Sequence, residues 1–363
     1  QDDQIDVKLG TFVTRIDRSL RHIVLDTGEV LPYQTLVLAT GARARKLPSD
    51  QGGEGSNVFT LRTLDDADKL RPHMQPEKSL LIVGGGYIGL EMAAVARKLG
   101  LKVTLIELSE RLLNRVASAE TAAYFKSLHK SHEVEICEKT GIESVSRAGD
   151  KVVSVTLTSG KQLNVDLVIV GIGVEVNNGI AKEAGLTTGL GIEVDETGRT
   201  SDPCIYAVGD CIHGPMLAHK AEDDGVAVAE IIAGKAGHVN YNTVPGVVYT
   251  APEIANVGQT EEQLKEAGIP YKKGKFAFAA NSRARANHKT DGFVKILAHA
   301  ETDEILGAHM IGAHAGDLIA EVALAMEFRA ASEDIARTCH AHPTISEAVR
   351  QAAMDVEGWT MQS

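Results

Sequence analysis

Hydrophobic and polar positions alternate in two separate stretches of the chain, and each stretch ends in an apolar run followed by glycine. The first is residues 5–41, IDVKLGTFVTRIDRSLRHIVLDTGEVLPYQTLVLATG, and the second is residues 134–173, VEICEKTGIESVSRAGDKVVSVTLTSGKQLNVDLVIVGIG. Alternation with a period of two predicts antiparallel strands, and each apolar run predicts a buried strand. Because strands and turns follow in the same order in both stretches, the pattern indicates an internal repeat of a whole domain.

A nucleotide-binding βαβ unit is predicted directly before the second stretch, in residues 79–107, SLLIVGGGYIGLEMAAVARKLGLKVTLIE. The pattern predicts a strand over 80–83, a glycine-rich turn, a helix over about 87–99 and a strand over 102–106. The turn has the form Gly-x-Gly-x-x-Gly and contains Gly84, Gly86 and Gly89. Such glycines permit a tight turn, close approach of a pyrophosphate, and close packing of helix on strand. A glycine-rich turn without a ligand is the alternative.

The acid Glu107 ends the second strand of this unit, about twenty residues beyond the turn. A carboxylate at this position accepts hydrogen bonds from the ribose hydroxyls of a dinucleotide. Its charge would repel the 2′-phosphate of NADPH, so the sequence favours NADH. An acid at the end of a surface strand, without a ligand, is the alternative for Glu107.

No glycine-rich turn stands before the first stretch, although its closing strand, residues 35–39, also stops at Thr40-Gly41. We interpret this strand as the end of a dinucleotide-binding domain, and we expect the βαβ unit that opens that domain to lie before residue 1. The predicted fold class is therefore α/β, with two Rossmann-like domains of which the first is truncated at its N-terminus.

Composition places the chain among soluble globular proteins and excludes some partners. Its 363 residues suggest two or three domains, and 44% are hydrophobic and 24% charged. A net charge of −12 argues against a nucleic-acid partner. The apolar runs, such as residues 167–176, are too short to span a membrane, and residues 1–10 do not resemble a signal peptide. We therefore expect a cytoplasmic protein.

The cysteines favour a reducing compartment, because none of the four forms a close pair: Cys137, Cys204, Cys211 and Cys339. Cys339 lies beside His340 and His342, but a zinc site needs a second pair of ligands, and the sequence offers none at a matching spacing. We therefore expect no metal.

Four short motifs now give a resemblance: ATG at 39–41, GGGYIG at 84–89, GIG at 171–173 and AVGDC at 207–211. With the repeat, they resemble the FAD- and NAD-dependent pyridine nucleotide–disulfide oxidoreductase superfamily over essentially the whole chain. Residues 1 to about 212 look most like ferredoxin reductases of dioxygenase and cytochrome P450 systems, through stretches such as LVLATGARARKLP and SDPCIYAVGDC. Residues 213–363 look like a bacterial dihydrolipoyl dehydrogenase, through stretches such as GPMLAHKAEDDGVAVAEIIAGK and CHAHPTISEAVRQAAMDVEGW.

The chain departs from the resembled pattern at three places. The first Gly-x-Gly-x-x-Gly turn and the redox-active cysteine pair of dihydrolipoyl dehydrogenases do not occur in it. The proline–asparagine pair expected after the GIG motif is replaced by Val176-Asn177. These departures leave open how the adenosine half of FAD is held and where a redox dithiol would come from.

The resemblance implies a flavin site and completes the nicotinamide site. It implies that Asp210 binds the ribityl hydroxyls of FAD, next to a helix that opens near Leu217 and Ala218 and points at the flavin. The other flavin positions that it implies are Ala39, Thr40, Gly41 and Gly209. At the nicotinamide site it implies Tyr87 as a gate and Glu91 as a polar contact. The remaining nicotinamide-site positions are Ile88, Gly171 and Gly173. Plain packing is the alternative for Tyr87, and capping of a turn is the alternative for Asp210.

By the same resemblance, His342 is the acid–base group of dithiol exchange and Glu347 orients it. The alternative comes from the residues themselves: TISE at 344–347 has the form of a capping box, with Thr344 as N-cap. One carboxylate can serve both roles. The helix predicted over 316–330 carries an apolar face, which in the resembled family belongs to a dimer interface.

We therefore expect four segments: a truncated FAD-binding domain (1–72), an NAD-binding domain (73–197), the return of the FAD-binding domain (198–245), and an α+β dimerisation domain (246–363). The predicted function is an FAD-dependent NADH oxidoreductase that passes electrons to an iron–sulfur ferredoxin. One alternative is a dihydrolipoyl dehydrogenase acting on a lipoyl domain, and the other is a non-catalytic, NAD-binding, dimerising module. The expected partners are NADH, one of these acceptors and a second copy of the chain.

Overall fold

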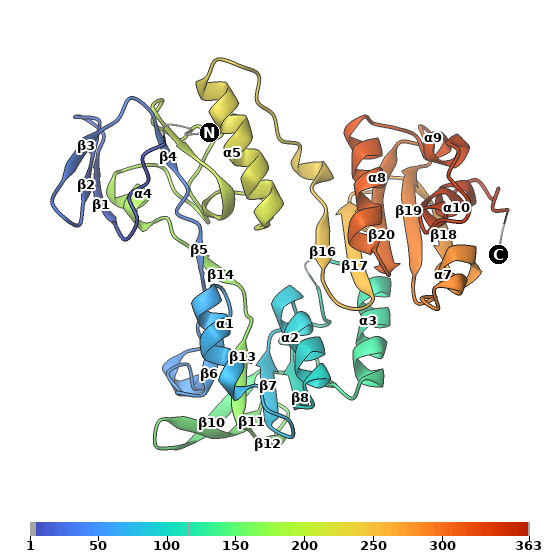
Figure 1. The fold of residues 1–363 in the computed structure, drawn as a ribbon, viewed down its shortest axis with the longest axis horizontal. Helices are drawn as coiled ribbons and strands as arrows, with labels where there is room; N and C mark the ends of the chain where they lie inside the picture. Colours follow the sequence, from blue (N-terminus) through green and yellow to red (C-terminus); the bar gives the residue numbers. More distant parts are fainter. Residues whose placement is uncertain (1–4, 115, 362–363) are drawn as a thin grey trace. The chain divides into compact units, whose positions relative to one another are not determined.

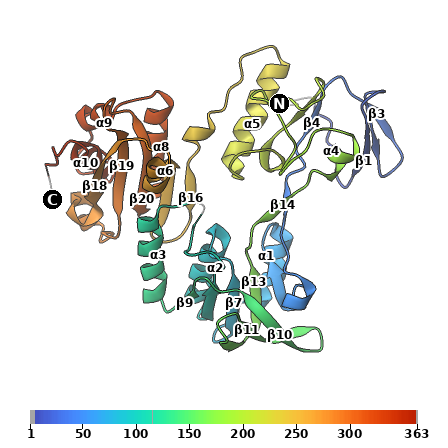
Figure 2. The same ribbon diagram turned by 180° about the vertical axis from the view of Figure 1, so that it is seen from behind.

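The structure, a computed structural model, describes residues 5–114 and 116–361. The chain forms two compact units. The first consists of the residues up to Arg43 together with Val174–Tyr241, and the second of Ala44–Gly173 together with Asn242–Ser363. Figures 1 and 2 show the elements of both.

The first unit contains an antiparallel three-stranded meander and a pair of parallel strands. The meander is β1 (Val13–Asp17), β2 (His22–Leu25) and β3 (Val30–Pro32), and the parallel pair is β4 (Leu36–Leu38) with β15 (Ile205–Ala207). The helices are α4 (Gly179–Glu183) and α5 (Ala218–Ile232). Ile205 and Ala207 face the core that the meander and α4 complete, whereas Tyr206 packs on the other side, against Val228 of α5. Strand β15 is wholly apolar because both of its faces are covered.

The second unit contains the predicted nucleotide-binding sheet, which is parallel and has the order β6-β13-β7-β8-β9. Its strands are β6 (Val58–Thr60), β7 (Ser79–Val83), β8 (Lys102–Ile106), β9 (Glu135–Cys137) and β13 (Leu167–Val170). The helices of this part are α1 (Leu64–Leu70), α2 (Tyr87–Lys98) and α3 (Ala119–Ser131), and the second meander is β10 (Ile142–Ala148), β11 (Lys151–Leu157) and β12 (Gln162–Asn164). Leu80 and Ile82 of β7 enter one core, and Leu81 and Val83 enter another. The apolar run thus serves a strand that is buried on both faces.

The C-terminal part of the second unit is an antiparallel sheet with helices packed on it. The sheet has the order β16-β17-β20-β19-β18, and its strands are β16 (Gly246–Val248), β17 (Glu253–Gly258), β18 (Tyr271–Ala277), β19 (Phe293–His299) and β20 (Ile305–Gly312). The helices are α6 (Glu261–Glu266), α7 (Ser282–Ala286), α8 (Ala315–Glu327), α9 (Ser332–Arg337) and α10 (Glu347–Asp355). Helix α8 packs on β17 and β20, and α10 packs on β18 and β19 (Figure 1).

The predicted α/β class and the internal repeat are both present, but the units divide at different residues from those expected. Residues 44–72, expected in the first domain, belong to the second unit, because β6 completes the parallel sheet beside β13. Residues 174–197, expected in the second domain, return to the first unit, where α4 packs on β1. Strands β5 (Ala42–Ala44) and β14 (Val174–Val176) pair where the chain passes between the units.

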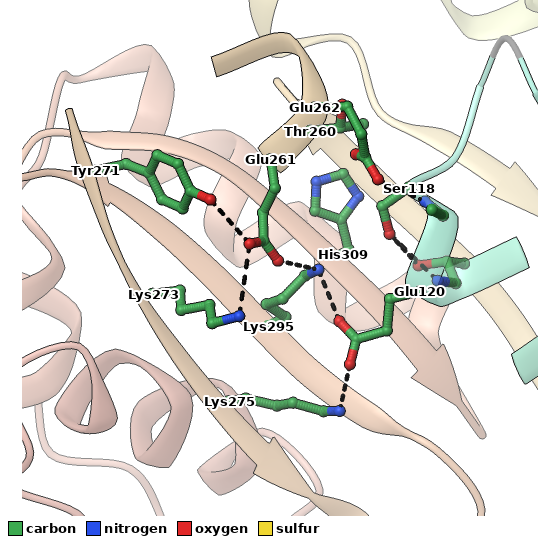
Figure 3. A network of polar contacts seen from close by, with 12 residues as sticks. Ser118, Glu120, Thr260, Glu261, Glu262, Tyr271, Lys273, Lys275, Lys295 and His309 are labelled. Atoms are coloured by element: carbon green, nitrogen blue, oxygen red, sulfur yellow. Dashed lines mark hydrogen bonds and ion pairs between the residues drawn. The ribbon is translucent and has the colours of Figure 1, made fainter. Parts of the chain in front are cut away.

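A charged cluster joins helix α3 to the antiparallel sheet within the second unit (Figure 3). Lys295 of β19 has only 1% of its side chain exposed, and its Nζ lies 2.8 Å from Glu120 Oε2 and 2.9 Å from Glu261 Oε1. Glu262 accepts a hydrogen bond from the backbone N–H of Ala119, at the first turn of α3. The parallel and antiparallel parts of this unit are thus held together by ionic and capping contacts, in addition to apolar packing.

Candidate functional site

The glycine-rich turn leaves open space at one glycine and is tightly packed at the other two. A Cβ on Gly84 would lie 2.4 Å from the Gly171 carbonyl oxygen, and one on Gly89 would lie 1.9 Å from the Gly84 carbonyl oxygen. A Cβ on Gly86 would meet nothing within 4 Å. Gly86 is also the N-cap of α2 and provides no side-chain cap, so the turn presents main-chain amides beside open space. This cradle fits the pyrophosphate of a dinucleotide.

Glu107 is fixed at this turn by both of its carboxylate oxygens. Oε2 accepts from the backbone N–H of Gly85 at 2.7 Å, and Oε1 accepts from that of Ser109 at 2.7 Å. The side chain is therefore held against the glycine loop rather than extended into solvent. The structure thus places the Glu107 carboxylate directly at the glycine-rich turn.

The two glycines after β13 lie on the other side of the turn. Gly171 donates its N–H to the Val83 carbonyl at 2.8 Å, which sets its own carbonyl against Gly84. Gly173 has a φ of +97°, and a Cβ there would meet nothing within 4 Å. Ile88, at the start of α2, is 37% exposed. The predicted dinucleotide residues around the turn therefore gather at one edge of the parallel sheet.

Tyr87 and Glu91 contact the C-terminal part of the same unit, which the sequence did not predict. The backbone N–H of Tyr249 donates to Glu91 Oε1 at 2.9 Å. The Tyr87 hydroxyl lies beside Gly246, where an added Cβ would approach it to 2.8 Å. Burial and the charge of Glu91 raise the pKa of Tyr87 to about 12, so this hydroxyl stays protonated at neutral pH. Tyr87 thus packs on the segment around β16.

The expected flavin residues of the first unit lie on the turns that follow β4 and β15. Gly209 and Asp210 form a short 3₁₀ turn after β15, and Leu217 is the N-cap of α5 without a side-chain cap. Thr40 Oγ donates to the Asn177 carbonyl at 2.6 Å, and Asn177 Nδ2 returns a bond to the Thr40 carbonyl at 2.9 Å. Asn177 therefore holds the Ala39–Gly41 turn in place.

A buried ionic group beneath Gly209 was missed from the sequence. Lys220, with 0% of its side chain exposed, pairs with Asp224 at 2.7 Å and donates to the Gly209 carbonyl at 3.2 Å. Asp224 accepts the Gly209 N–H at 2.9 Å and the Tyr241 hydroxyl at 2.8 Å. The only sequence signal was the spacing of four residues between a lysine and an aspartate on one helix. These contacts fix the backbone of the turn that carries Asp210.

The ring and ribityl half of FAD fits these residues better than the adenosine half does. Asp210 and the uncapped N-terminus of α5 are an acceptor and a set of main-chain donors in one unit. Among the described residues of that unit, no strand is followed by a Gly-x-Gly-x-x-Gly turn and a helix. A second cradle for a pyrophosphate is therefore not supplied by the described part of residues 1–43 or by residues 174–241.

His342 and Glu347 form a hydrogen-bonded pair before α10. His342 Nδ1 lies 2.9 Å from Glu347 Oε1, and Glu347 Oε2 accepts the backbone N–H of Thr344 at 2.9 Å. Ser346, not the predicted Thr344, is the N-cap of α10, because the Thr344 hydroxyl donates instead to the Ala341 carbonyl. The capping box is thus half formed, and one carboxylate both caps the chain and holds the histidine.

The environment of Glu347 keeps it ionised. Burial acts to raise its pKa, but the Thr344 amide and the His342 ring outweigh burial and lower the pKa below its usual value. The His342 side chain is 62% exposed, and its Nε2 has no partner among the residues that the structure describes. The pair can therefore accept a proton at Nε2 while Nδ1–H is fixed by Glu347.

Neither a metal-binding cluster nor a membrane-spanning helix occurs among the described residues. In residues 5–114 and 116–361, no group of three or more His, Cys, Asp or Glu side chains is placed to hold a metal ion. Over the same residues, no helix combines the length and the apolar character that crossing a membrane requires. The four cysteines are all free thiols, and Cys339 is exposed.

Comparison with known families gives two matches that together span most of the chain. The family described as pyridine nucleotide-disulphide oxidoreductase matches residues 1–225, and its dimerisation domain matches residues 244–353. Members of this family use FAD and NAD(H).

Curated relatives and solved structures agree with this assignment. The chain is 44% identical to dihydrolipoyl dehydrogenase 3 of Pseudomonas putida, over 92% of this chain and 71% of that protein. It is 42% identical to the mitochondrial dihydrolipoyl dehydrogenase of Dictyostelium discoideum, over 92% and 69%. An NAD-dependent persulfide reductase from A. fulgidus matches with a TM-score of 0.83 and 25% identity, over 94% and 67%. The ferredoxin reductase of the CYP199A2 system from Rhodopseudomonas palustris matches with a TM-score of 0.76 and 29% identity, over 94% and 81%.

Proposed function

Because the chain belongs to the pyridine nucleotide-disulphide oxidoreductase family, a family of flavoprotein NAD(H) oxidoreductases, we propose that it works as a dihydrolipoyl-dehydrogenase-type enzyme. In this proposal electrons pass between a dithiol substrate, FAD and NAD(H). The observation that carries it is the His342–Glu347 pair, with Nδ1 fixed and Nε2 exposed. An acid–base group next to a thiol is needed for dithiol exchange, and it has no role in one-electron transfer to a ferredoxin.

The acceptor changes with this proposal. The sequence motifs favoured an iron–sulfur ferredoxin, but relatives at 42–44% identity are dihydrolipoyl dehydrogenases, whereas the ferredoxin reductase structure is 29% identical. Each of these relatives covers 92% of the chain, so the likeness includes most of the part that resembled ferredoxin reductases. The alternative that the sequence left open, a dithiol or disulfide acceptor, is therefore the better supported one.

Each part of the chain has a proposed task. Residues 44–173 bind NAD(H), with the amides at Gly86 on the pyrophosphate and Glu107 on the ribose. Residues 1–43 and 174–241 hold the ribityl side of FAD, through Asp210 and the N-terminus of α5. When bound, FAD supplies the group that exchanges a hydride with NAD(H). Residues 242–363 contribute dimerisation and His342.

His342 is proposed to move the protons of the substrate thiols. Because Glu347 holds Nδ1–H, the neutral ring presents a bare Nε2, which can take a proton from a thiol and return it in the reverse direction. Removal of this proton creates the thiolate, which is the nucleophile of disulfide exchange. Glu347 also stabilises the imidazolium that forms, because it stays ionised.

The test compares two kinds of acceptor on the FAD-loaded protein. His342→Gln should lower dihydrolipoamide-dependent NAD⁺ reduction by about 100-fold or more, the usual range for a lost general base. The same variant should oxidise NADH with ferricyanide, an acceptor without thiols, at the parent rate, since no thiol proton moves in that reaction.

Other outcomes would assign the alternatives. NADH-driven reduction of a [2Fe–2S] ferredoxin that is fast and indifferent to His342→Gln, with no dihydrolipoamide activity in the parent, would restore the ferredoxin proposal. A parent protein that binds NADH and dimerises but turns over none of these acceptors would be the non-catalytic module.

A further inference from the structure

A second histidine–carboxylate pair lies beside the first on the segment between α9 and α10. His340 Nε2 lies 2.8 Å from Glu321 Oε1, and His340 Nδ1 lies 2.9 Å from the Thr338 carbonyl oxygen. Glu321 belongs to α8, so this contact ties the segment to the helix below it. Only 7% of the His340 side chain is exposed, against 62% for His342 two residues later.

Hydrogen-bond chemistry gives the two histidines different properties. A carbonyl oxygen and an ionised carboxylate only accept hydrogen bonds, whereas a neutral imidazole carries one N–H and can satisfy only one of them. Both contacts of His340 are hydrogen bonds only when each ring nitrogen carries a proton. His342 has just one such contact among the described residues, through Nδ1, and keeps the other nitrogen open.

We infer that His340 is a positioning residue, buried between Glu321 and the Thr338 carbonyl, which fastens the His342 segment to helix α8. This inference rests on the proposed function of His342 as the proton carrier. Two histidines on one short segment would thus have two tasks: His340 holds the segment in place, and His342 exchanges protons.

The groups around His340 make Glu321 its principal side-chain contact. Glu321 faces it from α8, whereas Glu347 at the start of α10 is occupied by His342 and the Thr344 amide. The nearest cation of α9, Arg337, is turned toward Glu333 and stacks on Trp359. Among the described residues, loss of Glu321 would leave the His340 ring with the Thr338 carbonyl alone.

The geometry also indicates what the anchor does for His342. Glu347 reaches His342 from one side through a single hydrogen bond, and its other oxygen is already occupied by the Thr344 amide. A loose segment at 338–342 would let the exposed ring leave Glu347 at little cost, because a side chain that is 62% exposed has few packing contacts to hold it. His340 restrains the same segment through its contact with Glu321 of α8.

The first test measures the contact between His340 and Glu321 directly. In protein labelled with ¹⁵N at histidine, the ring resonances of His340, assigned with His340→Gln, should change in Glu321→Gln because the contact with Nε2 is lost. They should stay as in the parent protein in Asp317→Asn. Unchanged His340 resonances in Glu321→Gln would overturn the inference, whatever the activity of His342 proves to be.

The second test reads the consequence. In the FAD-loaded protein, Glu321→Gln should lower the ratio of dihydrolipoamide to ferricyanide turnover by about tenfold and shift the pH profile of the dihydrolipoamide reaction, because a misplaced proton carrier loses rate steeply. The matched control is Asp317→Asn. It removes a carboxylate from the same helix, where Asp317 forms an exposed pair with His314 at 3.4 Å. Asp317→Asn should leave the ratio of dihydrolipoamide to ferricyanide turnover and the pH profile unchanged.

The outcomes separate the anchor from the proposed function. A parental ratio and profile in Glu321→Gln would overturn the positioning role. If His342→Gln keeps full dihydrolipoamide activity, the proposed function fails, and the ring resonances still decide whether Glu321 holds His340.

Discussion

At the scale of single residues, the position of Glu107 predicts which nicotinamide cofactor the protein prefers. Its two oxygens are held by the amides of Gly85 and Ser109, so the carboxylate is fixed at the dinucleotide turn. We expect NADH to bind more tightly than NADPH, and Glu107→Gln to narrow the ratio of their dissociation constants by about five- to tenfold. A unit charge 4 Å away contributes ~1 kcal/mol in water, and 1.4 kcal/mol corresponds to about tenfold.

Fluorescence titration with both nucleotides measures this ratio. The matched control is Glu110→Gln, which removes an exposed carboxylate paired with Lys139 near the same strand end and should leave the ratio unchanged. NADPH binding as tight as NADH binding in the parent protein would contradict the role given to Glu107.

Residues that lie at fixed spacings along the chain could be predicted from the sequence. Residues that are defined by their burial and their partners could not. The turn glycines and Glu107 lie at fixed offsets along one βαβ unit, so the sequence alone predicted that they meet at one turn. Lys220 has 0% exposure, although lysines are almost never fully buried without a partner, and its partner lies on the inner side of the same helix. Glu347 had two interpretations from the sequence, and the structure gives one carboxylate oxygen to each.

At the scale of secondary-structure elements, the charged cluster around Lys295 shows what periodicity leaves out. Its members come from β19, α3 and α6, and Lys295 and Glu120 are 175 residues apart in the chain. The sequence predicted the strand, helix and turn of the nucleotide-binding unit, and all are present at α2, β7 and β8. The contact that fastens α3 to the antiparallel sheet needed coordinates, because no local pattern encodes a pairing at that distance.

This cluster should make the protein sensitive to acid in two steps. Burial lowers the pKa of His309, which faces Lys295 across the β19–β20 register, to about 4 from 6.5. A base whose folded pKa is depressed loses stability as pH falls from about 6.5 to 4, because only the unfolded state binds the proton. For Glu261, burial acts upward, but Lys295 and Tyr271 outweigh it and lower the pKa to about 2 from 4.5. Its contribution is present above pH 4.5 and is lost as pH falls toward 2.

Glu261→Gln tests the second step. It should lower the free energy of unfolding at pH 7 by about 3 kcal/mol, since it leaves the buried Lys295 with one carboxylate. It should also flatten the loss of stability between pH 4.5 and pH 2. Urea unfolding across this range measures both effects. Lys273→Gln removes the more exposed partner of Glu261, 3.5 Å away, and should change stability by less than ~1 kcal/mol. Equal losses in the two variants would contradict the importance of Lys295.

At the scale of the whole molecule, the sequence predicted the kinds of domain but placed their limits too far along the chain. The internal repeat was visible because each meander and closing strand has its own alternation. Strand β6, Val58-Phe59-Thr60, is too short to show any period, so the start of the second unit was not visible. The electron acceptor could not be predicted from the cofactor motifs. Ferredoxin reductases and dihydrolipoyl dehydrogenases bind the same cofactors, so these motifs do not distinguish the two types of enzyme. The proposed dithiol acceptor therefore rests on the residues around His342 and on the curated relatives.

The last prediction concerns assembly. Helix α8 buries Leu318, Ile319 and Val322 in its own core, but Leu324 is 61% and Phe328 79% exposed, one helical turn apart. Both lie in the region that matches the dimerisation domain of the family, so we propose that a second copy of the chain covers them. Burial of each side chain would stabilise a dimer by ~1.5–3 kcal/mol. The double variant Leu324→Glu/Phe328→Glu should therefore weaken association by about 100-fold or more, since 1.4 kcal/mol corresponds to about tenfold.

In sedimentation at micromolar concentration, the parent should run as a dimer and the double variant as a monomer. Val226→Glu, which charges an equally exposed apolar position on α5 of the first unit (60% exposed), should remain a dimer. A parent that sediments only as a monomer, or a double variant that sediments with the parent, would remove α8 from the interface.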